Sequence, residues 1–180
     1  MTHRLETARL TLPVGQRDHA QGPEAAAVTL VEYGDYECPH CGRAYPIVKR
    51  VQQRLGDRLR FVFRNFPLTG LHPHAQHAAE AAGAAAAQGR FWEMHDCLYE
   101  HQEALDDDSL ERYALSLGLD LARFSRELDG HAHAPRVRED FMSGLRSGVN
   151  GTPTFYLNGM RYDGAWDLET LVAAIEQHAL

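Results

Sequence analysis

Two closely spaced cysteines, in the stretch Cys38-Pro39-His40-Cys41, carry the most recognisable chemistry of this sequence. Cysteines separated by two residues can close a small disulfide ring, or they can offer two thiolates to a metal ion. A short β-type run, Val28–Tyr33, precedes the pair, and a segment with helical spacing follows it at once. The sequence therefore predicts two reactive sulfurs where a strand passes into a helix, and both kinds of chemistry are open at this point.

The position of Cys38 favours its ionised form. We expect Cys38 at the N-terminus of the helix and Pro39 at the first helical position, where the missing N–H costs nothing. The unpaired N–H groups and the helix dipole favour negative charge there, and a cationic His40 would act in the same direction. A pKa of ~4 instead of ~8.5 would stabilise the reduced form by roughly 4 kcal/mol at pH 7, equivalent to ~90 mV of oxidising power. Cys41, one turn further, is expected to be the resolving thiol.

Length, composition and charge restrict the class of protein. The chain has 180 residues, 44% hydrophobic and 24% charged, which suits one globular domain. A net charge of −7 and a pI near 5.8 argue against a nucleic-acid or membrane partner. No apolar run reaches membrane-spanning length, and the N-terminal residues lack the apolar part of a secretory signal. We therefore expect a cytoplasmic protein, in which such a cysteine pair is catalytic, redox-sensing or metal-binding.

The first part of the chain has the pattern of a strand–helix–strand unit. Its predicted strands are Arg9–Pro13, Val28–Tyr33 and Arg58–Phe66, and residues 14–27 are predicted to be a loop. The helix after the cysteines is expected to end at Gly56 and to be kinked by Pro46. A crossover of this length predicts parallel strands with a right-handed connection.

The pattern from residue 72 to residue 148 is helical only, and one of its helices has a capping-box-like start at Asp108. A hairpin over Thr154–Asp163 follows, in which Asn158-Gly159 suits a type I′ turn, and Asp167 caps a last helix. We therefore predict a single α/β domain over residues 1–180, with an all-helical insertion at 72–148.

The strand–cysteine pair–helix unit, the helical insertion and the late Gly151-Thr-Pro-Thr-Phe155 resemble the DsbA-like branch of the thioredoxin superfamily. The resemblance is closest over Val28–Gly42 and Val149–Gly159. It implies a thioredoxin-like fold, with a central mixed β-sheet flanked by helices and an inserted all-helical block. It also implies a thiol–disulfide oxidoreductase that exchanges disulfides with protein or peptide substrates and requires no bound cofactor. Its redox partner stays open, with the glutathione system and the thioredoxin system as the candidates.

The resemblance also assigns roles to single residues. Cys38 corresponds to the attacking cysteine and Cys41 to the resolving one. Glu32 corresponds to the buried acid that thioredoxin-like proteins place beneath the disulfide. Pro153 corresponds to their cis-proline, which presents backbone to an extended substrate peptide. Thr152, where DsbA proteins usually carry valine, corresponds to the residue that contacts and tunes the active cysteine.

The residues around Glu32 give an independent reason to expect it in the interior, because its neighbours in the strand are apolar. Burial would raise the pKa of its carboxyl group. An acid with a raised pKa next to the cysteines could carry the proton of Cys41.

Three other interpretations compete with the oxidoreductase. A zinc site would need further ligands, and the histidines of His72-Pro-His74-Ala-Gln-His77 are the nearest candidates. A non-catalytic redox sensor or metal-binding module could use the same cysteine pair as a switch. A glutathione-dependent transferase or isomerase of the kappa type has a related fold, but the presence of both cysteines counts against it. Cys97 is predicted to be a small apolar residue on a helix face, and the spacing of His131 indicates no metal ligand.

Overall fold

The computed structural model describes residues 8–179, while residues 1–7 and 180 of the predicted domain lie outside the described residues. The strands are β1 His19–Gln21, β2 Val28–Gly34, β3 Leu59–Asn65, β4 Thr154–Leu157 and β5 Met160–Tyr162. The helices are α1 Pro39–Leu55, the short 3-10 turn η1 Gly56–Arg58, α2 Ala75–Ala86, α3 Phe91–Glu100, α4 Asp107–Ser116, α5 Leu121–Asp129, α6 Ala134–Arg146 and α7 Leu168–His178.

The five strands form one mixed sheet in the order β1-β3-β2-β4-β5. β2 and β3 are parallel and are joined through α1, which confirms the predicted strand–helix–strand unit. β4 lies on the other side of β2 and continues into β5 through Asn158 and Gly159, which have φ angles of +47° and +79°. These positive values are the ones that a type I′ hairpin turn requires. The structure is thus the thioredoxin-like fold that the sequence predicted.

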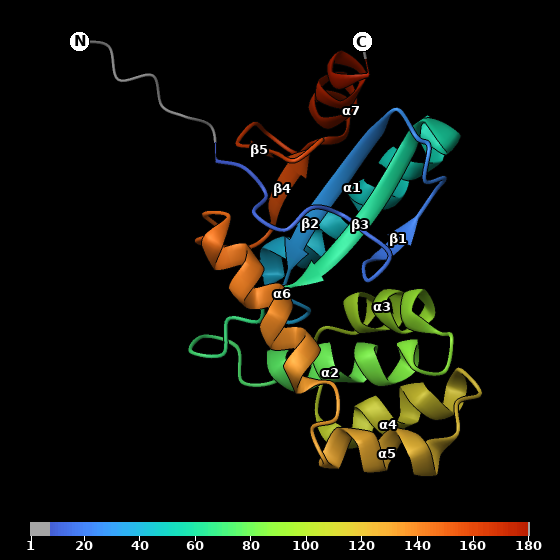
Figure 1. Ribbon diagram of the computed structural model, residues 1–180. Coiled ribbons are helices and arrows are strands. Elements are labelled where there is room, and N and C mark those ends of the chain that lie inside the picture. The colour runs from blue at the N-terminus through green and yellow to red at the C-terminus, as the bar shows by residue number, and fades with distance from the viewer. Residues whose placement is uncertain (1–7, 180) are drawn as a thin grey trace.

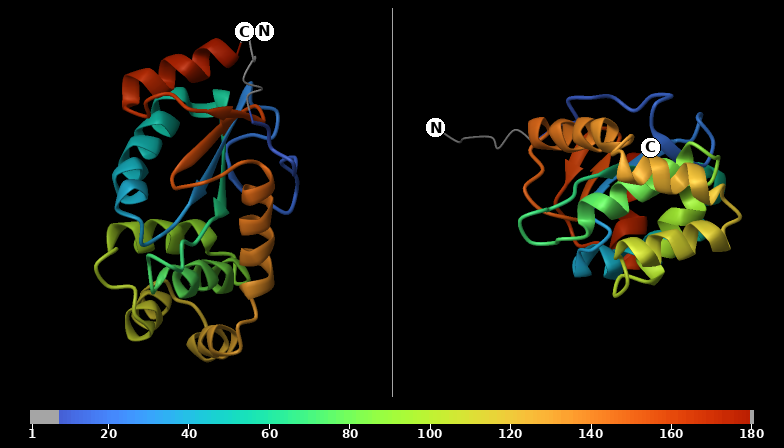
Figure 2. Two further views of the ribbon diagram at one scale, coloured as in Figure 1. Left: turned by 90° about the vertical axis from the view of Figure 1, so that its left-hand side faces the viewer. Right: turned by 90° about the horizontal axis from the view of Figure 1, so that it is seen from below.

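Helices cover both faces of the sheet (Figures 1 and 2). The left view of Figure 2 shows α1 on one side of the strands and α6 on the other. Alternate residues of β2 enter different apolar clusters, because side chains of a strand point to opposite faces. Leu30 belongs to the larger cluster, which also holds Leu171 of α7, whereas Val31 belongs to the smaller one, against which Phe141 of α6 packs. The sheet that carries the cysteines is therefore buried on both faces.

The helical insertion gathers beyond the carboxyl ends of β2 and β3 (Figure 1). Helices α2 to α6 span residues 75–146 and lie inside the predicted segment 72–148. Its central helix, α2, packs closely, since seven of its eight buried residues are alanines. The eighth is Glu80. No helix of the described part of the chain is both long and apolar enough to cross a membrane.

The predicted first strand, Arg9–Pro13, was wrong. Within this segment Arg9 makes only an isolated bridge to Met160. The carbonyl groups of Leu12 and Pro13 accept hydrogen bonds from the guanidinium of Arg64 instead of from a neighbouring strand. The backbone of this segment therefore finds its hydrogen-bond donors in the buried side chain of Arg64. The alternation of residues in the sequence does not reveal such a partner.

The first strand is β1, which lies inside the predicted loop of residues 14–27 and pairs with β3 in antiparallel orientation. Long-range contacts hold it in place: the His19 ring stacks on Phe91 with 3.7 Å between centroids, and the adjacent Asp18 forms an ion pair with Arg64. The predicted start of α4 was also wrong by two residues, because Asp106 and not Asp108 caps this helix, accepting a hydrogen bond from the backbone of Ser109.

Candidate active site

The two cysteines lie at the first turn of α1, directly beyond the carboxyl end of β2. Cys38 is the N-cap residue and Pro39 occupies the first helical position, as the sequence predicted. The backbone N–H of Cys38 donates to the carbonyl of Asp35 at 3.1 Å, which fixes the turn between strand and helix. Both cysteines are free thiols and almost fully buried, with Cys38 3% and Cys41 0% exposed. The fold therefore presents both sulfurs at a helix N-terminus.

The surroundings of Cys38 stabilise its thiolate. A hydrogen bond from the Cys41 thiol is the main cause, and it outweighs burial, lowering the pKa of Cys38 to about 5. The Thr152 side chain and the backbone N–H groups of Cys41 and His40 lower this pKa further. Among residues 8–179 the buried Thr152 hydroxyl has no hydrogen-bond partner, so it is free to donate to the Cys38 thiolate. Cys38 is therefore ionised at neutral pH, which makes it the nucleophile of the pair.

Cys41 has the opposite environment. Burial raises the pKa of Cys41 well above its ordinary value, and the hydrogen bond to Cys38 and the charge of Glu32 add to this effect. A thiol that keeps its proton cannot attack a disulfide until a base removes that proton. The two sulfurs thus differ in reactivity, with Cys38 suited to attack and Cys41 to a later step.

His40 affects Cys38 in a way that the sequence did not indicate. Its side chain is exposed, and its Nδ1 lies 2.5 Å from Nη2 of Arg43, which donates to it. The influence of His40 on the thiolate comes from its backbone N–H. The helix backbone at His40, and not a cationic ring as predicted, therefore lowers the pKa of Cys38.

Glu32 lies inside β2, between Phe63 of β3 and Phe155 of β4 in the register of the sheet. It is 2% exposed, and within the described residues its Oε1 has no hydrogen-bond partner. Burial, together with the negative charge of Cys38, raises the pKa of Glu32 to about 8. A cavity of about 10 Å³, lined by Glu32, Lys49 and Gln52 among others, adjoins the carboxyl group and is about the size of one water molecule. Glu32 is therefore a protonated acid at neutral pH, close to the point of titration.

Thr152 and Pro153 come from the far end of the chain and face the cysteine pair. The peptide bond between them is cis. The Thr152 carbonyl oxygen lies 3.6 Å from the sulfur of Cys38, which donates to it in the thiol form. Both residues are partly exposed, in the segment that leads into β4. The backbone beside Cys38 is thus accessible next to an attacking sulfur.

The sequence analysis missed two carboxylate–histidine pairs that hold the segment before Cys38. Asp35, 1% exposed, accepts from the Leu68 backbone, and its Oδ2 lies 2.8 Å from Nδ1 of His72. Glu37 contacts His74 through both the backbone N–H and the ring. Partial burial alone would lower the pKa of His72, but the hydrogen bond to Asp35 raises it. These histidines therefore position the cysteine-bearing turn and are paired with carboxylates, not with sulfur.

Gln102 is a further residue that sequence reasoning missed, because it lies in the loop after α3, more than sixty positions from the cysteines. Its Nε2 donates to the carbonyl oxygens of Tyr36 and Cys38 at 2.8 and 2.9 Å. It also lies against Gly42, where an added Cβ would come within 1.9 Å of its Oε1. The helical insertion thus contacts the active-site turn directly. Cys97, partly buried on α3, has its sulfur 3.9 Å from Nδ1 of His101, and burial raises the pKa of its thiol to about 11.

Replacing Glu32 with glutamine is expected to slow attack by Cys41 by up to about 100-fold near neutral pH, the lower end of what a positioned base contributes. Alkylation of Cys38 should not slow, because its own stabilising donors remain. The pKa of Glu32 rises from 4.5 to about 8 on folding, so the unfolded chain loses this proton at lower pH than the folded protein does. The stability of the wild-type protein should therefore fall as the pH rises from 4.5 to 8. The stability of the variant should not fall over this range. Unchanged kinetics of the Cys41 step in stopped-flow exchange would contradict the role of Glu32.

The fold and this site define a dithiol protein of thioredoxin type: a cysteine pair at the start of α1, an acid beneath it and a cis-proline beside it. The family model described as Thioredoxin matches residues 15–177. The chain therefore belongs to the thioredoxin family, and its structure is DsbA-like.

Solved structures agree with this assignment. BdbD of Bacillus subtilis, in its oxidised form, has a TM-score of 0.83 and 25% identity, covering 97% of this chain and 99% of that protein. A thioredoxin-like oxidoreductase of Silicibacter pomeroyi has a TM-score of 0.77 and 27% identity, covering 91% and 92%. The thiol–disulfide exchange protein α-DsbA2 of Wolbachia pipientis shares the fold, with a TM-score of 0.79 and 22% identity over 90% of this chain and 87% of that protein.

The curated relatives have names that refer to ion transport and not to thiol chemistry. A protein named Na⁺/H⁺ antiporter NhaA 3, from Salinispora tropica, is 49% identical over 167 residues. The match covers 92% of this chain and 26% of the relative. A protein named Na⁺/H⁺ antiporter NhaA, from Herminiimonas arsenicoxydans, is 43% identical over 88% of this chain and 25% of its own length. The chain thus spans about a quarter of the length of the curated relatives it matches.

Proposed function

We propose that this protein is a thiol–disulfide oxidoreductase that exchanges disulfides with protein or peptide substrates through Cys38 and Cys41. The observation that carries the proposal is the opposite ionisation of the two thiols, with the pKa of Cys38 lowered to about 5 and that of Cys41 raised. A cysteine pair that only holds the structure or a metal ion does not require one ionised and one protonated sulfur. An exchange enzyme needs both, because one sulfur attacks first and the other completes the cycle.

The proposed cycle has two displacements. The Cys38 thiolate attacks one sulfur of a substrate disulfide, forming a mixed disulfide and releasing the other substrate sulfur as a thiolate. Glu32, in its carboxylate form, takes the proton of Cys41, and the resulting thiolate attacks the Cys38 sulfur. The Cys38–Cys41 disulfide forms, and the second substrate sulfur leaves as a thiolate. The substrate gains two electrons and the protein loses two, so an external thiol must reduce the protein again. The same steps run in reverse when the protein oxidises a substrate.

The substrate surface in this proposal is the backbone around Thr152 and Pro153. An extended peptide that lies along this segment would bring its cysteine to Cys38, because the Thr152 carbonyl is already 3.6 Å from that sulfur. Recognition through main-chain groups tolerates many side chains. We therefore propose unfolded or extended protein segments as substrates, and the glutathione or thioredoxin system as the redox partner.

The antiporter activity named for the curated relatives does not enter this proposal, since the match covers only about a quarter of their length. The cytoplasmic location stays a prediction, which fractionation of the native host would test. In a reducing cytoplasm the glutathione pool would hold such a pair reduced, and the protein would then act as a reductase.

Insulin precipitation in the presence of dithiothreitol tests the proposed function. We expect the protein to accelerate the reaction, and Cys38→Ser to abolish the acceleration because no thiolate remains to attack. Cys97→Ser is the matched control and should retain full activity, since that thiol lies away from the pair. A wild-type protein without turnover, or a Cys38→Ser protein as active as wild type, would leave the non-catalytic redox sensor as the better description.

A further inference from the structure

A second group of chemically active side chains lies in the helical insertion, around Glu80. This residue is 1% exposed, and its carboxylate contacts Nε2 of Gln76 at 3.2 Å and Nδ1 of His131 at 3.0 Å. Between residues 8 and 179 no lysine or arginine forms an ion pair with it. Buried carboxylates in proteins are paired with a positive group or coordinate a metal ion. Its environment therefore favours the binding of a cation.

His77 lies one turn before Glu80 on α2, so both side chains share one face of the helix. The Nδ1 atom of His77 lies 2.7 Å from Oδ1 of Asp107, the first residue of α4. A hydrogen bond to a carboxylate places the proton on Nδ1 and leaves the lone pair of Nε2 available. Histidines that bind metals are oriented in this way by a carboxylate on the other ring nitrogen.

His131 completes the group from the connection between α5 and α6. Its ring lies beside that of His77, with 5.4 Å between the centroids, and its side chain is 57% exposed. The backbone of His131 has a φ of +53°, in the left-handed region that non-glycine residues rarely adopt. This conformation turns the ring back towards α2 and onto the carboxylate of Glu80.

We propose that His77, Glu80 and His131 bind one divalent transition-metal ion of the zinc class. Each offers one ligand atom, and these atoms all lie within 4.8 Å of one another. Two imidazole nitrogens and one carboxylate oxygen form a donor set that suits Zn²⁺, which binds them at about 2.0–2.2 Å. Ligand atoms around such an ion are roughly 3.3 Å apart, so the rings of His77 and His131 need to close by up to about 1.5 Å.

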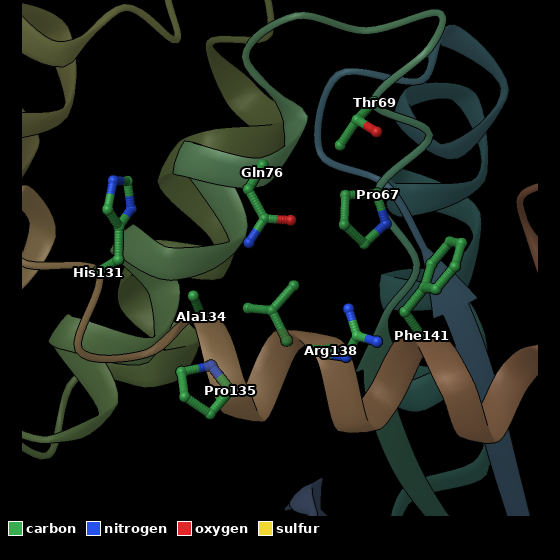
Figure 3. Close-up of a pocket in the computed structure, with 9 residues that line it drawn as sticks. Pro67, Thr69, Gln76, His131, Ala134, Pro135, Arg138 and Phe141 are labelled. Carbon is green, nitrogen blue, oxygen red and sulfur yellow. The ribbon is translucent and has the colours of Figure 1, made fainter.

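Three protein ligands leave one position of a tetrahedral ion open. A cavity of about 560 Å³ adjoins the group, and Gln76 and His131 are part of its wall. Figure 3 shows this cavity, with His131 on the loop before α6 and Arg138 on α6. None of its lining residues belongs to the cysteine site. The metal would thus connect α2 to the α5–α6 loop beside this cavity, independently of the dithiol.

Metal titration of the full-length protein tests this proposal. All proteins carry Cys97→Ser and are used with Cys38 and Cys41 joined as a disulfide, so that no thiolate competes for the ion. We expect one Zn²⁺ per chain by calorimetry after treatment with a chelator. Co²⁺ should give the visible bands of a four-coordinate site without the charge-transfer band of a sulfur ligand. Zn²⁺ should also raise the melting temperature.

The variants His77→Gln and Glu80→Gln should each weaken Zn²⁺ binding by at least about tenfold. Asp107→Asn should weaken it by about 10-fold to 100-fold through the orientation of His77, without changing the melting temperature measured with chelator. His178→Gln, at the exposed end of α7, is the matched control and should bind like the parent. Absence of binding, or equal affinity in the parent, His77→Gln and Asp107→Asn, would overturn the proposal. The His77→Gln and Asp107→Asn variants keep the test decisive if Glu80→Gln does not fold, because neither side chain is buried.

Discussion

Replacing Cys41 with serine is expected to lower multiple-turnover disulfide exchange by about 100-fold or more while leaving the first attack intact. In the wild-type protein Cys41 lies one helical turn from Cys38 and attacks the mixed disulfide within the same molecule. A second thiol from solution must replace that attack in the variant, and it lacks the high effective concentration of an oriented neighbour. Serine keeps a hydroxyl donor near Cys38, so the nucleophile itself should remain largely ionised.

The visible consequence is accumulation of the mixed disulfide. Non-reducing electrophoresis and intact mass measurement should show the Cys41→Ser protein covalently joined to a reporter peptide, and dithiothreitol should release it. Adding Cys38→Ser to this variant should remove the adduct, whereas adding Cys97→Ser should not. An adduct that persists without Cys38 would place the attacking thiol elsewhere, and wild-type turnover by Cys41→Ser would eliminate the resolving role.

The acidity of Cys38 is the second large effect that we expect. Its thiolate absorbance should titrate with a midpoint near pH 5, about four pH units below the ordinary value of 9.0. Because the hydrogen bond from Cys41 is the main cause, Cys41→Ala should move the midpoint upward. Cys97→Ser, the control, should move it little, because Cys97 is not among the groups that set this pKa. A midpoint at pH 8–9 in the wild-type protein, or no change in Cys41→Ala, would contradict this account.

The lowered pKa of Cys38 also predicts how the reduction potential depends on pH. Ionisation stabilises the reduced protein only above pH 5, and its contribution is lost as the pH falls through that value. At pH 7 the gain is about two pH units, roughly 2.7 kcal/mol or ~60 mV towards oxidising power. The potential should fall by about 59 mV per pH unit below pH 5 and by about 30 mV above it, since one proton fewer accompanies the two electrons. A single slope of about 59 mV from pH 4 to 8 would disprove the ionisation of Cys38.

The relation between the cysteines and their helix could be predicted from short stretches of sequence. Pro39 is compatible with the first helical turn, and the β-branched run before the pair predicts a buried strand that ends there. Asn158-Gly159 and Asp167 are equally local signals, since a turn or a cap depends on a few neighbouring residues. Even the burial of Glu32 follows from its apolar neighbours in the strand.

Contacts between distant segments could not be predicted in this way. The strand β1 exists because His19 stacks on Phe91, and the segment expected to be a strand instead serves Arg64. The pairing of Asp35 with His72 likewise depends on how the insertion lies against the end of the sheet. No spacing rule connects such residues, because packing decides which of many polar groups meet.

The sequence by itself therefore determined the strand–helix unit and the identity of the two sulfurs, since both follow from local pattern and capping, and its resemblance to DsbA-like proteins implied the class of the protein. The sequence also predicted that Cys38 is the ionised sulfur, but only the tertiary structure decided what stabilises it, namely the hydrogen bond from Cys41 and the Thr152 segment more than a hundred residues away. The tertiary structure also brings His131 next to His77 and Glu80, although His131 lies more than fifty positions after both of them in the chain. Burial and distance set proton affinity and ligand geometry, and both exist only once the chain is packed.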